Sequence, residues 1–222
     1  MIELFQITGS TSFAARAALE EAGAEYVTVD VHPRHRREAP GFAEVNPLLR
    51  VPALRDGEAI VYETGAVLLY LAERFPEVQL APVPGSPARG PYLRWLTWLS
   101  NSLHPIWQPV NVPRFLSDDP VGHEGIRAKG IGRLEAAGRY LERELAGREW
   151  CAGDAFSVAD IYLYMLKGWE SYADGLTLGG DAVGAHYALV GARPAIARTR
   201  QLDDLDERLL RHHPELRAGK PL

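Results

Sequence analysis

The sequence predicts an α/β domain at the N-terminus followed by an all-α domain, and three observations support this. Residues 1–75 alternate strand-forming and helical stretches in the order β-α-β-(α)-β-β-α. Residues 76–91 then hold five prolines and two glycines, which excludes regular structure. Nearly every later segment has helical spacing. We therefore expect domains at 1–76 and 91–222, joined by a linker at 77–90.

The start of the α/β domain predicts a parallel β-α-β unit. The stretches IELFQI (2–7) and EYVTVDV (25–31) are short, apolar and partly β-branched, as strands are. Between them the alanine-rich segment 12–22 predicts a helix that Gly23 ends. This connection is long enough for the two strands to run parallel.

The rest of the domain predicts a hairpin and a second long helix. Residues 32–50 are polar and interrupted by prolines, so we expect a loop with one short helix at most. Residues 51–61 carry two short strand-forming runs around Asp56-Gly57, a hairpin pattern. In ETGAVLLYLAERF (63–75) the apolar residues have helical spacing.

The C-terminal part predicts several helices. Residues 92–103 and 123–147 have helical spacing, and three prolines between 105 and 113 must bend or end the first of these helices. Residues 157–169 are apolar on almost every side, so we expect the buried central helix of the domain. A last helix is expected over residues 192–210.

Composition excludes several classes of protein. The net charge of −5 argues against nucleic-acid binding, which needs a basic face. No apolar run reaches the length of about 20 residues that spans a bilayer, and Glu3 and Gln6 interrupt any signal peptide. The single cysteine, Cys151, excludes a disulfide framework, and the histidines lack metal-binding spacing. We expect a cytoplasmic protein without a metal, a nucleic-acid partner or a membrane partner.

The stretch FSVADI (156–161) predicts a helix start. Ser157 and Asp160 have the spacing of a capping box, in which each side chain accepts a hydrogen bond from the other residue's backbone amide. Asp160 is therefore expected to act in folding rather than in catalysis. Cys151, just before this stretch, is expected to be buried and inert.

Two stretches suit a peptide-like ligand, although each also has a purely structural interpretation. In NPLLRVPAL (46–54), Pro52 indicates either an edge strand or a cis bond after Val51 that turns the Val51 backbone toward a ligand. In YETGAV (62–67), Thr64 could simply cap a helix. Alternatively, the helix amides and Thr64 could bind a carboxylate while Glu63 binds an ammonium group.

The stretch ITGSTSFAAR (7–16) raises the same question. Ser10, Thr11 and Ser12 stand between a strand and a helix, where such residues usually cap the helix. A thiolate held at that point would also be stabilised by the helix dipole and by a hydroxyl donor.

Together, NPLLRVPAL, ETGAVLLYL and GDAFSVADIYLY resemble a cytosolic glutathione S-transferase in order and spacing, and the resemblance covers nearly the whole chain. It implies a thioredoxin-like, glutathione-binding N-terminal domain with a four-stranded mixed sheet (β-α-β-α-β-β-α) and an all-α C-terminal domain. It also implies a homodimer, glutathione as cosubstrate, and conjugation of its thiolate to a hydrophobic electrophile.

The resemblance further implies contacts with glutathione. The Val51 backbone would pair with the cysteinyl part, Pro52 would be cis, and Glu63 and Thr64 would hold the γ-glutamyl amine and carboxylate. Four other residues are implied nearby: Arg50 for a carboxylate, Arg34 (or Arg36) for the glycyl carboxylate, and His104, which would face the site from the second domain.

For catalysis, Ser12 occupies the place of the serine in theta-like members. Thr11 stands where beta-like members have a cysteine and zeta-like members a serine. The layout is beta-like without that cysteine, so cysteine-dependent thiol transfer is not expected. Ser12, with Thr11 as the alternative, is expected to donate to the glutathione sulfur. Leu49 stands where the family commonly has glycine, so the turn there must tolerate a side chain.

The acceptor is expected between the domains, near Phe13, Trp107 and Trp169. Two other functions remain open. A non-catalytic ligand-binding or interaction protein of the same fold is one, although keeping Glu63, Thr64 and Val51-Pro52 speaks against it. A glutathione-dependent isomerase of the zeta kind is the other, although the serine-cysteine signature expected there is missing.

Overall fold

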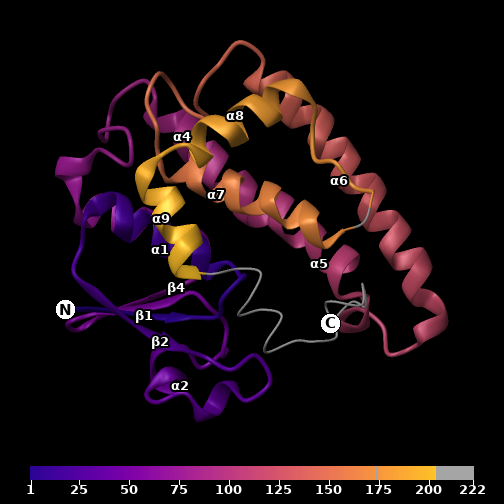
Figure 1. Cartoon of the computed structure of the whole chain (residues 1–222), viewed down its shortest axis with the longest axis horizontal. Coiled ribbons are helices and arrows are strands. Elements are labelled where there is room, and N and C mark those ends of the chain that lie inside the picture. The colour runs from indigo at the N-terminus through magenta and orange to yellow at the C-terminus, as the bar shows by residue number, and fades with distance from the viewer. Residues whose placement is uncertain (174, 204–222) are drawn as a thin grey trace.

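The computed structural model describes residues 1–173 and 175–203. In that part of the chain, four strands form one mixed sheet in the order β2-β1-β3-β4 (Figure 1). The strands are β1 (Ile2–Gln6), β2 (Tyr26–Asp30), β3 (Ala53–Asp56) and β4 (Ala59–Tyr62). β1 runs parallel to β2 and antiparallel to β3, and β3 is antiparallel to β4. The predicted thioredoxin-like sheet is confirmed.

Helices cover both faces of this sheet. Leu4 and Leu54 lie in one core with residues of α1 (Ser12–Ala22) and α3 (Thr64–Arg74). Their neighbours Phe5 and Ala53 point the other way, into a smaller core with the short α2 (Phe42–Val45). Successive strand residues alternate between faces, which explains this division. α2 accordingly lies on the opposite side of the sheet from α1 (Figure 1).

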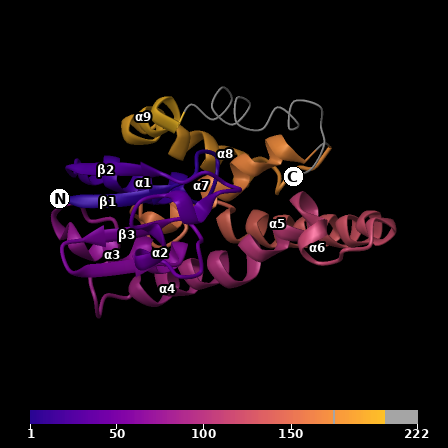
Figure 2. The same ribbon diagram turned by 90° about the horizontal axis from the view of Figure 1, so that it is seen from below.

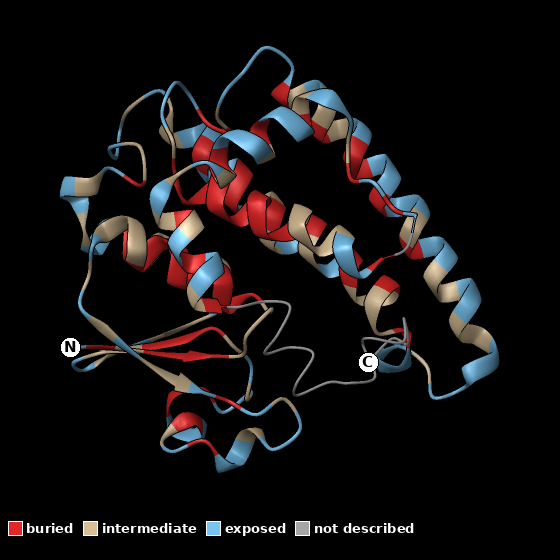
Figure 3. Ribbon diagram, viewed as in Figure 1, coloured by how far each residue is buried: buried red, intermediate tan, exposed pale blue. Residues whose placement is uncertain are grey.

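The C-terminal part is helical, as expected. It contains six α-helices in the described residues: α4 (Arg89–Trp98), α5 (His104–Asn111), α6 (His123–Leu145), α7 (Val158–Gly168), α8 (Asp181–Gly191) and α9 (Pro194–Asp203). All residues of α7 from Val158 to Leu166 are buried, which confirms the predicted central helix (Figure 3). Residues 204–210 of the predicted last helix lie outside the described part of the chain.

Proline shapes the first of these helices. α4 passes into α5 through a π-helical stretch, Leu99–Leu103, just before Pro105. Proline has no amide hydrogen and clashes with the preceding turn, so a wider turn relieves the conflict. Pro109 lies inside α5, which ends at Asn111, before Pro113. The prolines thus mark the bend and the end that the sequence predicts.

The two parts of the chain meet along α1, which contacts both α7 and α9. Arg193 strengthens this boundary by donating to both carboxylate oxygens of Glu21, at 2.6 and 2.8 Å. The strands and the far end of α6 lie at opposite ends of the molecule (Figure 2). Because α1 lies at this boundary, the turn between β1 and α1, which directly precedes it, lies at the domain boundary too. None of the described helices combines the length and apolarity needed to cross a bilayer.

Candidate functional site

The turn between β1 and α1 is held together by its own hydroxyl groups. The Ser10 hydroxyl donates to the Ile7 carbonyl at 2.6 Å, and the Ile7 amide donates to Ser12 Oγ at 3.2 Å. The oxygens of Ser10 and Ser12 are 3.2 Å apart. Ser12 is fully buried, whereas Ser10 is partly exposed. In this conformation, the predicted Ser12 hydroxyl faces the interior of the turn.

Thr11 links this turn to the loop before β3. Its hydroxyl donates to the Val51 carbonyl at 2.7 Å. The Val51–Pro52 bond is cis, as the resemblance implies. The edge-strand interpretation of Pro52 is wrong, because β3 lies between β1 and β4 and begins only at Ala53. Thr11, Val51 and Pro52 therefore share one corner of the molecule.

The loop before Val51 contains a strained residue. Leu49 has φ of +54°, in the left-handed region that favours glycine. This agrees with the expectation that the turn tolerates a side chain where glycine is common. Arg36 supports the loop by donating to the carbonyls of Leu49 (2.9 Å) and Pro33 (2.8 Å). Burial, with a smaller effect of the Arg50 charge, lowers the pKa of Arg36.

The two candidates for the glycyl carboxylate thus differ in their surroundings. Arg36 is half-buried and bound to backbone carbonyls, while Arg34 and Arg50 are exposed. A guanidinium already engaged by two carbonyls has fewer donors left for a ligand. Arg36 thus serves the loop itself.

Glu63 and Thr64 stand where α3 begins. Thr64 is buried and is the first residue of the helix, while Glu63 is exposed and has φ of +73°. A left-handed conformation costs a glutamate on the order of 1–3 kcal/mol, and such strain is often found at ligand sites. No feature of the sequence predicts this conformation of Glu63. Glu63 is the N-cap residue of α3, directly before the amides of the first helical turn.

A hydrogen-bonded tyrosine joins this helix start to the second domain. His104 Nδ1 lies 2.9 Å from the Tyr162 hydroxyl. Burial raises the pKa of Tyr162 to about 12, while the nearby hydroxyls of Ser100 and Thr64 act in the opposite direction. Tyr162 of α7 thus lies near Thr64 of α3 and bonds to His104 of α5. Sequence reasoning missed Tyr162, since its spacing shows only a buried helix.

His104 is neutral near pH 7. Burial lowers its pKa to about 4, and the positive charge of Arg50 contributes to the same shift. Its ring packs edge-on against Trp169, with centroids 5.3 Å apart. The charge of Arg50, from the first domain, thus reaches His104 in the second.

A cavity of about 340 Å³ opens at the domain boundary beside the β1–α1 turn. Gly9, Ser10 and Phe13 line it on one side, and Trp169 lines it on the other. Two of the three predicted acceptor residues, Phe13 and Trp169, thus meet here. Trp107 does not line the cavity, since it is fully buried and packs perpendicular to Trp169, with centroids 6.1 Å apart.

The cavity also contains residues that sequence reasoning missed. Tyr164, Tyr187 and Arg200 come from three different helices, so no local pattern could have grouped them. A wider hollow of about 770 Å³ lies beside β2, α1 and α9, lined among others by Tyr26 and Arg198. It holds none of the predicted site residues.

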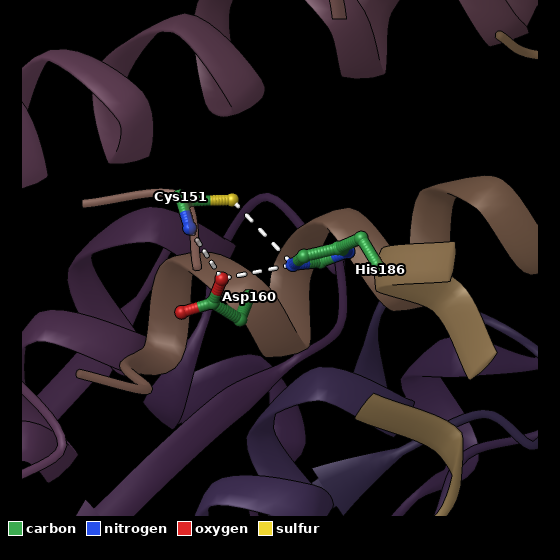
Figure 4. A group of neighbouring side chains, drawn as sticks. All are labelled: Cys151, Asp160 and His186. Carbon is green, nitrogen blue, oxygen red and sulfur yellow. Dashed lines mark hydrogen bonds and ion pairs between the residues drawn. The ribbon is translucent and has the colours of Figure 1, made fainter. Parts of the chain in front are cut away.

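A buried group of Cys151, Asp160 and His186 lies inside the helical domain (Figure 4). One nitrogen, His186 Nε2, faces both the Cys151 sulfur at 3.8 Å and Asp160 Oδ1 at 2.9 Å. A catalytic relay would need the two ring nitrogens to face different partners. The geometry therefore does not suit a cysteine nucleophile.

Asp160 completes the predicted capping box. Its carboxylate accepts from the Ser157 amide (2.8 Å), the Cys151 amide (2.7 Å) and His186. With these donors in place, the carboxylate has little capacity left to ligate a metal ion. Cys151 is buried as predicted, and burial, with the Asp160 charge, raises the pKa of its thiol. The group acts as a folding element.

Comparisons with known proteins agree with this arrangement. A family model described as the N-terminal domain of glutathione S-transferase matches residues 1–73. The chain is 30% identical over 199 residues to glutathione S-transferase GstA of Escherichia coli O157:H7, covering 88% of this chain and 95% of that protein. It is 35% identical over 144 residues to bovine glutathione S-transferase theta-1, covering 62% of this chain and 58% of that one.

A solved structure of a glutathione S-transferase is also similar to this chain. The structure of a sphingomonad glutathione S-transferase complexed with glutathione matches with a TM-score of 0.79 and 34% identity. The match covers 91% of this chain and 99% of that protein. Both domains are therefore included in the similarity.

Proposed function

Since the chain belongs to the glutathione S-transferase family, we propose that it joins the sulfur of glutathione to a small hydrophobic electrophile. The observation that carries this proposal is the hydrogen bond from Thr11 to the Val51 carbonyl. It brings the hydroxyl-bearing turn to the cis-proline loop, so that the thiol of a peptide paired with Val51 lies beside the start of α1.

Glutathione would lie along one side of the first domain. The Val51 backbone would pair with the cysteinyl unit, and Glu63 and Thr64 would hold the γ-glutamyl amine and carboxylate. Arg34 would meet the glycyl carboxylate, Arg50 would add a second positive charge, and His104 would face the site from α5. The exposure of Glu63, Arg34 and Arg50 leaves these groups accessible to a ligand.

The reaction needs a thiolate. The N-terminus of α1 and a hydroxyl donor would stabilise the deprotonated sulfur, and the thiol proton would pass to water. The sulfur lone pair then forms a carbon–sulfur bond, while the leaving group departs with the electrons of the bond it loses. The protein supplies no covalent nucleophile of its own.

Ser12 and Thr11 remain the proposed donors to the sulfur. Thr11 lies against Val51, where the cysteinyl unit would pair, but its proton is used by the Val51 carbonyl. The Ser12 oxygen has a longer contact, 3.2 Å to Ser10, but its side chain is buried. A sulfur that takes the Thr11 proton must therefore displace the Val51 carbonyl, whereas Ser12 accepts from Ile7 and Ser10 and keeps its own proton for a ligand that reaches it.

The thiol pKa of bound glutathione tests the proposal, measured from thiolate absorbance for the wild type and for Ser12→Ala, Thr11→Ala and Ser10→Ala. We expect the wild type to hold the pKa well below the value of about 8.5 for a free cysteine thiol. The variant that lacks the hydroxyl donor to the sulfur should raise the thiol pKa of bound glutathione. Binding of glutathione without any lowering of the pKa would instead support a non-catalytic binding protein.

We also propose that the chain forms a homodimer in the cytoplasm, as the resemblance to cytosolic members implies. Ile60 on β4 and Leu93 on α4 are 47% and 40% exposed, respectively, and would be candidates for a subunit contact. Sedimentation equilibrium tests this, and Ile60→Asp combined with Leu93→Asp should weaken the dimer. A monomer at all concentrations would refute it.

A further inference from the structure

The cavity beside the β1–α1 turn has one positively charged corner. Among the described residues that line it, Arg200 is the only one charged at neutral pH. Its Nη2 donates to the Gly191 carbonyl at 3.2 Å, which holds the guanidinium near the C-terminal end of α8. No carboxylate among the described lining residues neutralises it.

Two stacked tyrosines lie at the same corner. The rings of Tyr164 and Tyr187 are nearly parallel, with 12° between their planes and centroids 4.4 Å apart. Gly191 makes room for them, because a Cβ there would come within 3.1 Å of the Tyr164 ring. This corner is therefore a packed arrangement of side chains rather than a chance surface hollow.

The Tyr164 hydroxyl is the unusual group of this corner. Tyr164 is 3% exposed, and its hydroxyl forms no well-shaped hydrogen bond with the described residues, although Tyr187 and Arg200 lie close enough to affect its pKa. A buried polar group without a partner destabilises the fold, so it gains when a ligand supplies one. Burial raises the pKa of Tyr164, so the phenol stays protonated, and a small side-chain shift that uncovers the hydroxyl would let it donate to an anion.

Aromatic rings line the cavity between this corner and the turn. Phe13 of α1 is 5.9 Å from the Tyr164 ring, centroid to centroid, and Trp169 lines the same space. Ser10, next to the proposed thiolate donors, closes that end. The cavity thus has a reactive end at the turn, an aromatic middle and a positive, hydroxyl-rich end at Arg200.

We propose that this cavity takes a small aromatic electrophile bearing a carboxylate, with Arg200 and the Tyr164 hydroxyl holding the carboxylate and with Phe13 and Trp169 packing on the ring. This inference rests on the proposed function, since it names the substrate class of the same site. The volume of about 340 Å³ is near the lower limit of ligand pockets, which suits a single substituted ring.

Binding of unreactive analogues tests the inference without any need for catalysis. The probes are 3,5-dinitrobenzoate and its neutral isostere 3,5-dinitrobenzamide, with affinities measured calorimetrically in the wild type, Arg200→Gln and Tyr164→Phe. Arg200→Gln should weaken benzoate binding about tenfold, as expected for a charged hydrogen bond, and leave benzamide binding within about twofold. Because Arg200 is exposed, the benzoate preference should also fall as salt is added.

Arg198→Gln is the matched control. Arg198 belongs to the same helix and carries the same charge, but it pairs with Glu20 at 2.6 Å and does not line the cavity. It should leave both affinities unchanged. Equal losses for the two probes in Arg200→Gln, or an equal loss in Arg198→Gln, would overturn the inference.

Activity separates the inference from the proposed function. Conjugation of glutathione to 4-chloro-3,5-dinitrobenzoate and to the corresponding benzamide is followed in the same variants. Turnover of both substrates with no change in their ratio in Arg200→Gln would contradict the inference and leave the transferase proposal intact. Selective benzoate binding without turnover of either substrate would contradict the transferase proposal and leave the anion site intact.

Discussion

The Asp203 carboxylate, at the end of α9, accepts a hydrogen bond of 3.1 Å from the Gly9 amide in the β1–α1 turn. Residues at opposite ends of the described chain thus meet at the proposed thiolate site. Arg16 of α1 adds an ion pair of 3.6 Å to the same carboxylate, and both side chains are buried. The shape of the turn therefore depends on the docking of the last described helix.

Asp203→Ala should destabilise the protein and disturb the turn. Removing the carboxylate leaves the buried Arg16 charge and the partly buried Gly9 amide without this partner, at a cost of about 3 kcal/mol in the free energy of unfolding. Urea unfolding measures this loss, and glutathione affinity reports on the turn. Asp154→Ala removes an exposed aspartate and serves as the control. If both variants unfold at the same urea concentration, the hydrogen bond from Gly9 to Asp203 does not contribute to stability.

Asp160→Ala should cost more than a simple helix cap, which contributes about 1 kcal/mol. The carboxylate accepts from Ser157, Cys151 and His186, all buried, so we expect a loss of at least about 3 kcal/mol. Chemical denaturation measures it. Cys151→Ala, which keeps the backbone donor to Asp160, should cost much less. A loss in Asp160→Ala no greater than that of Cys151→Ala would contradict this account.

At position 49, glycine should be better tolerated than alanine. Leu49 has φ of +54° and packs partly against the small core around Phe42. Both substitutions lose that packing, but only glycine relieves the left-handed strain, by about 1 kcal/mol. Leu49→Gly should therefore unfold at a higher temperature than Leu49→Ala. If Leu49→Ala instead unfolds at the higher temperature, the backbone at position 49 is not left-handed in solution.

His104 should make stability depend on pH. Its pKa in the folded protein is about 4, below the unfolded value of about 6.5. Between these values the unfolded chain binds more protons, so stability falls as the pH drops from about 6.5 to about 4, by up to about 3 kcal/mol. Unfolding of the wild type and of His104→Gln across this range measures the effect. The difference in stability between the wild type and His104→Gln should change with pH. If the two curves of stability against pH are parallel, the lowered pKa of His104 is refuted.

Glu63→Gln should weaken glutathione binding by about tenfold or more, because the γ-glutamyl amine loses its carboxylate partner. The substitution keeps the size of an exposed side chain, so thermal stability should stay nearly constant. Calorimetric titration with glutathione measures the affinity. Glu73→Gln, on the same helix and paired with Arg89, is the control. Equal affinity in wild type and Glu63→Gln would exclude Glu63 from the γ-glutamyl site.

The elements with strong local patterns could be predicted from the sequence. The stretch 2–7 forms β1 at Ile2–Gln6 and 63–75 forms α3 at Thr64–Arg74, because a short apolar run and helical spacing both reflect what each element buries. The capping box of Ser157 and Asp160 could be predicted for the same reason, since every group in it is local.

Features that depend on packing could not be predicted. The conformation of Glu63 and the inward rotamer of Ser12 are set by neighbours, and neither residue type indicates them. The corner of Tyr164, Tyr187 and Arg200 joins three helices, so its members lie far apart in the sequence. The exclusion of Trp107 from the cavity likewise depends on the position of Trp169.

The π-helical stretch Leu99–Leu103 sets the rotational phase between α4 and α5. Ser100, within it, approaches Gly65 so closely that a Cβ on Gly65 would lie 3.2 Å from its hydroxyl oxygen. Each residue of an α-helix turns the chain by about 100°. A π turn holds one residue more than an α turn, so closing it to ordinary α winding without shortening the chain would rotate α5 by about that angle and turn His104 and Trp107 away from their present neighbours. This one wide turn thus fixes the direction in which the second domain presents its side chains to the first.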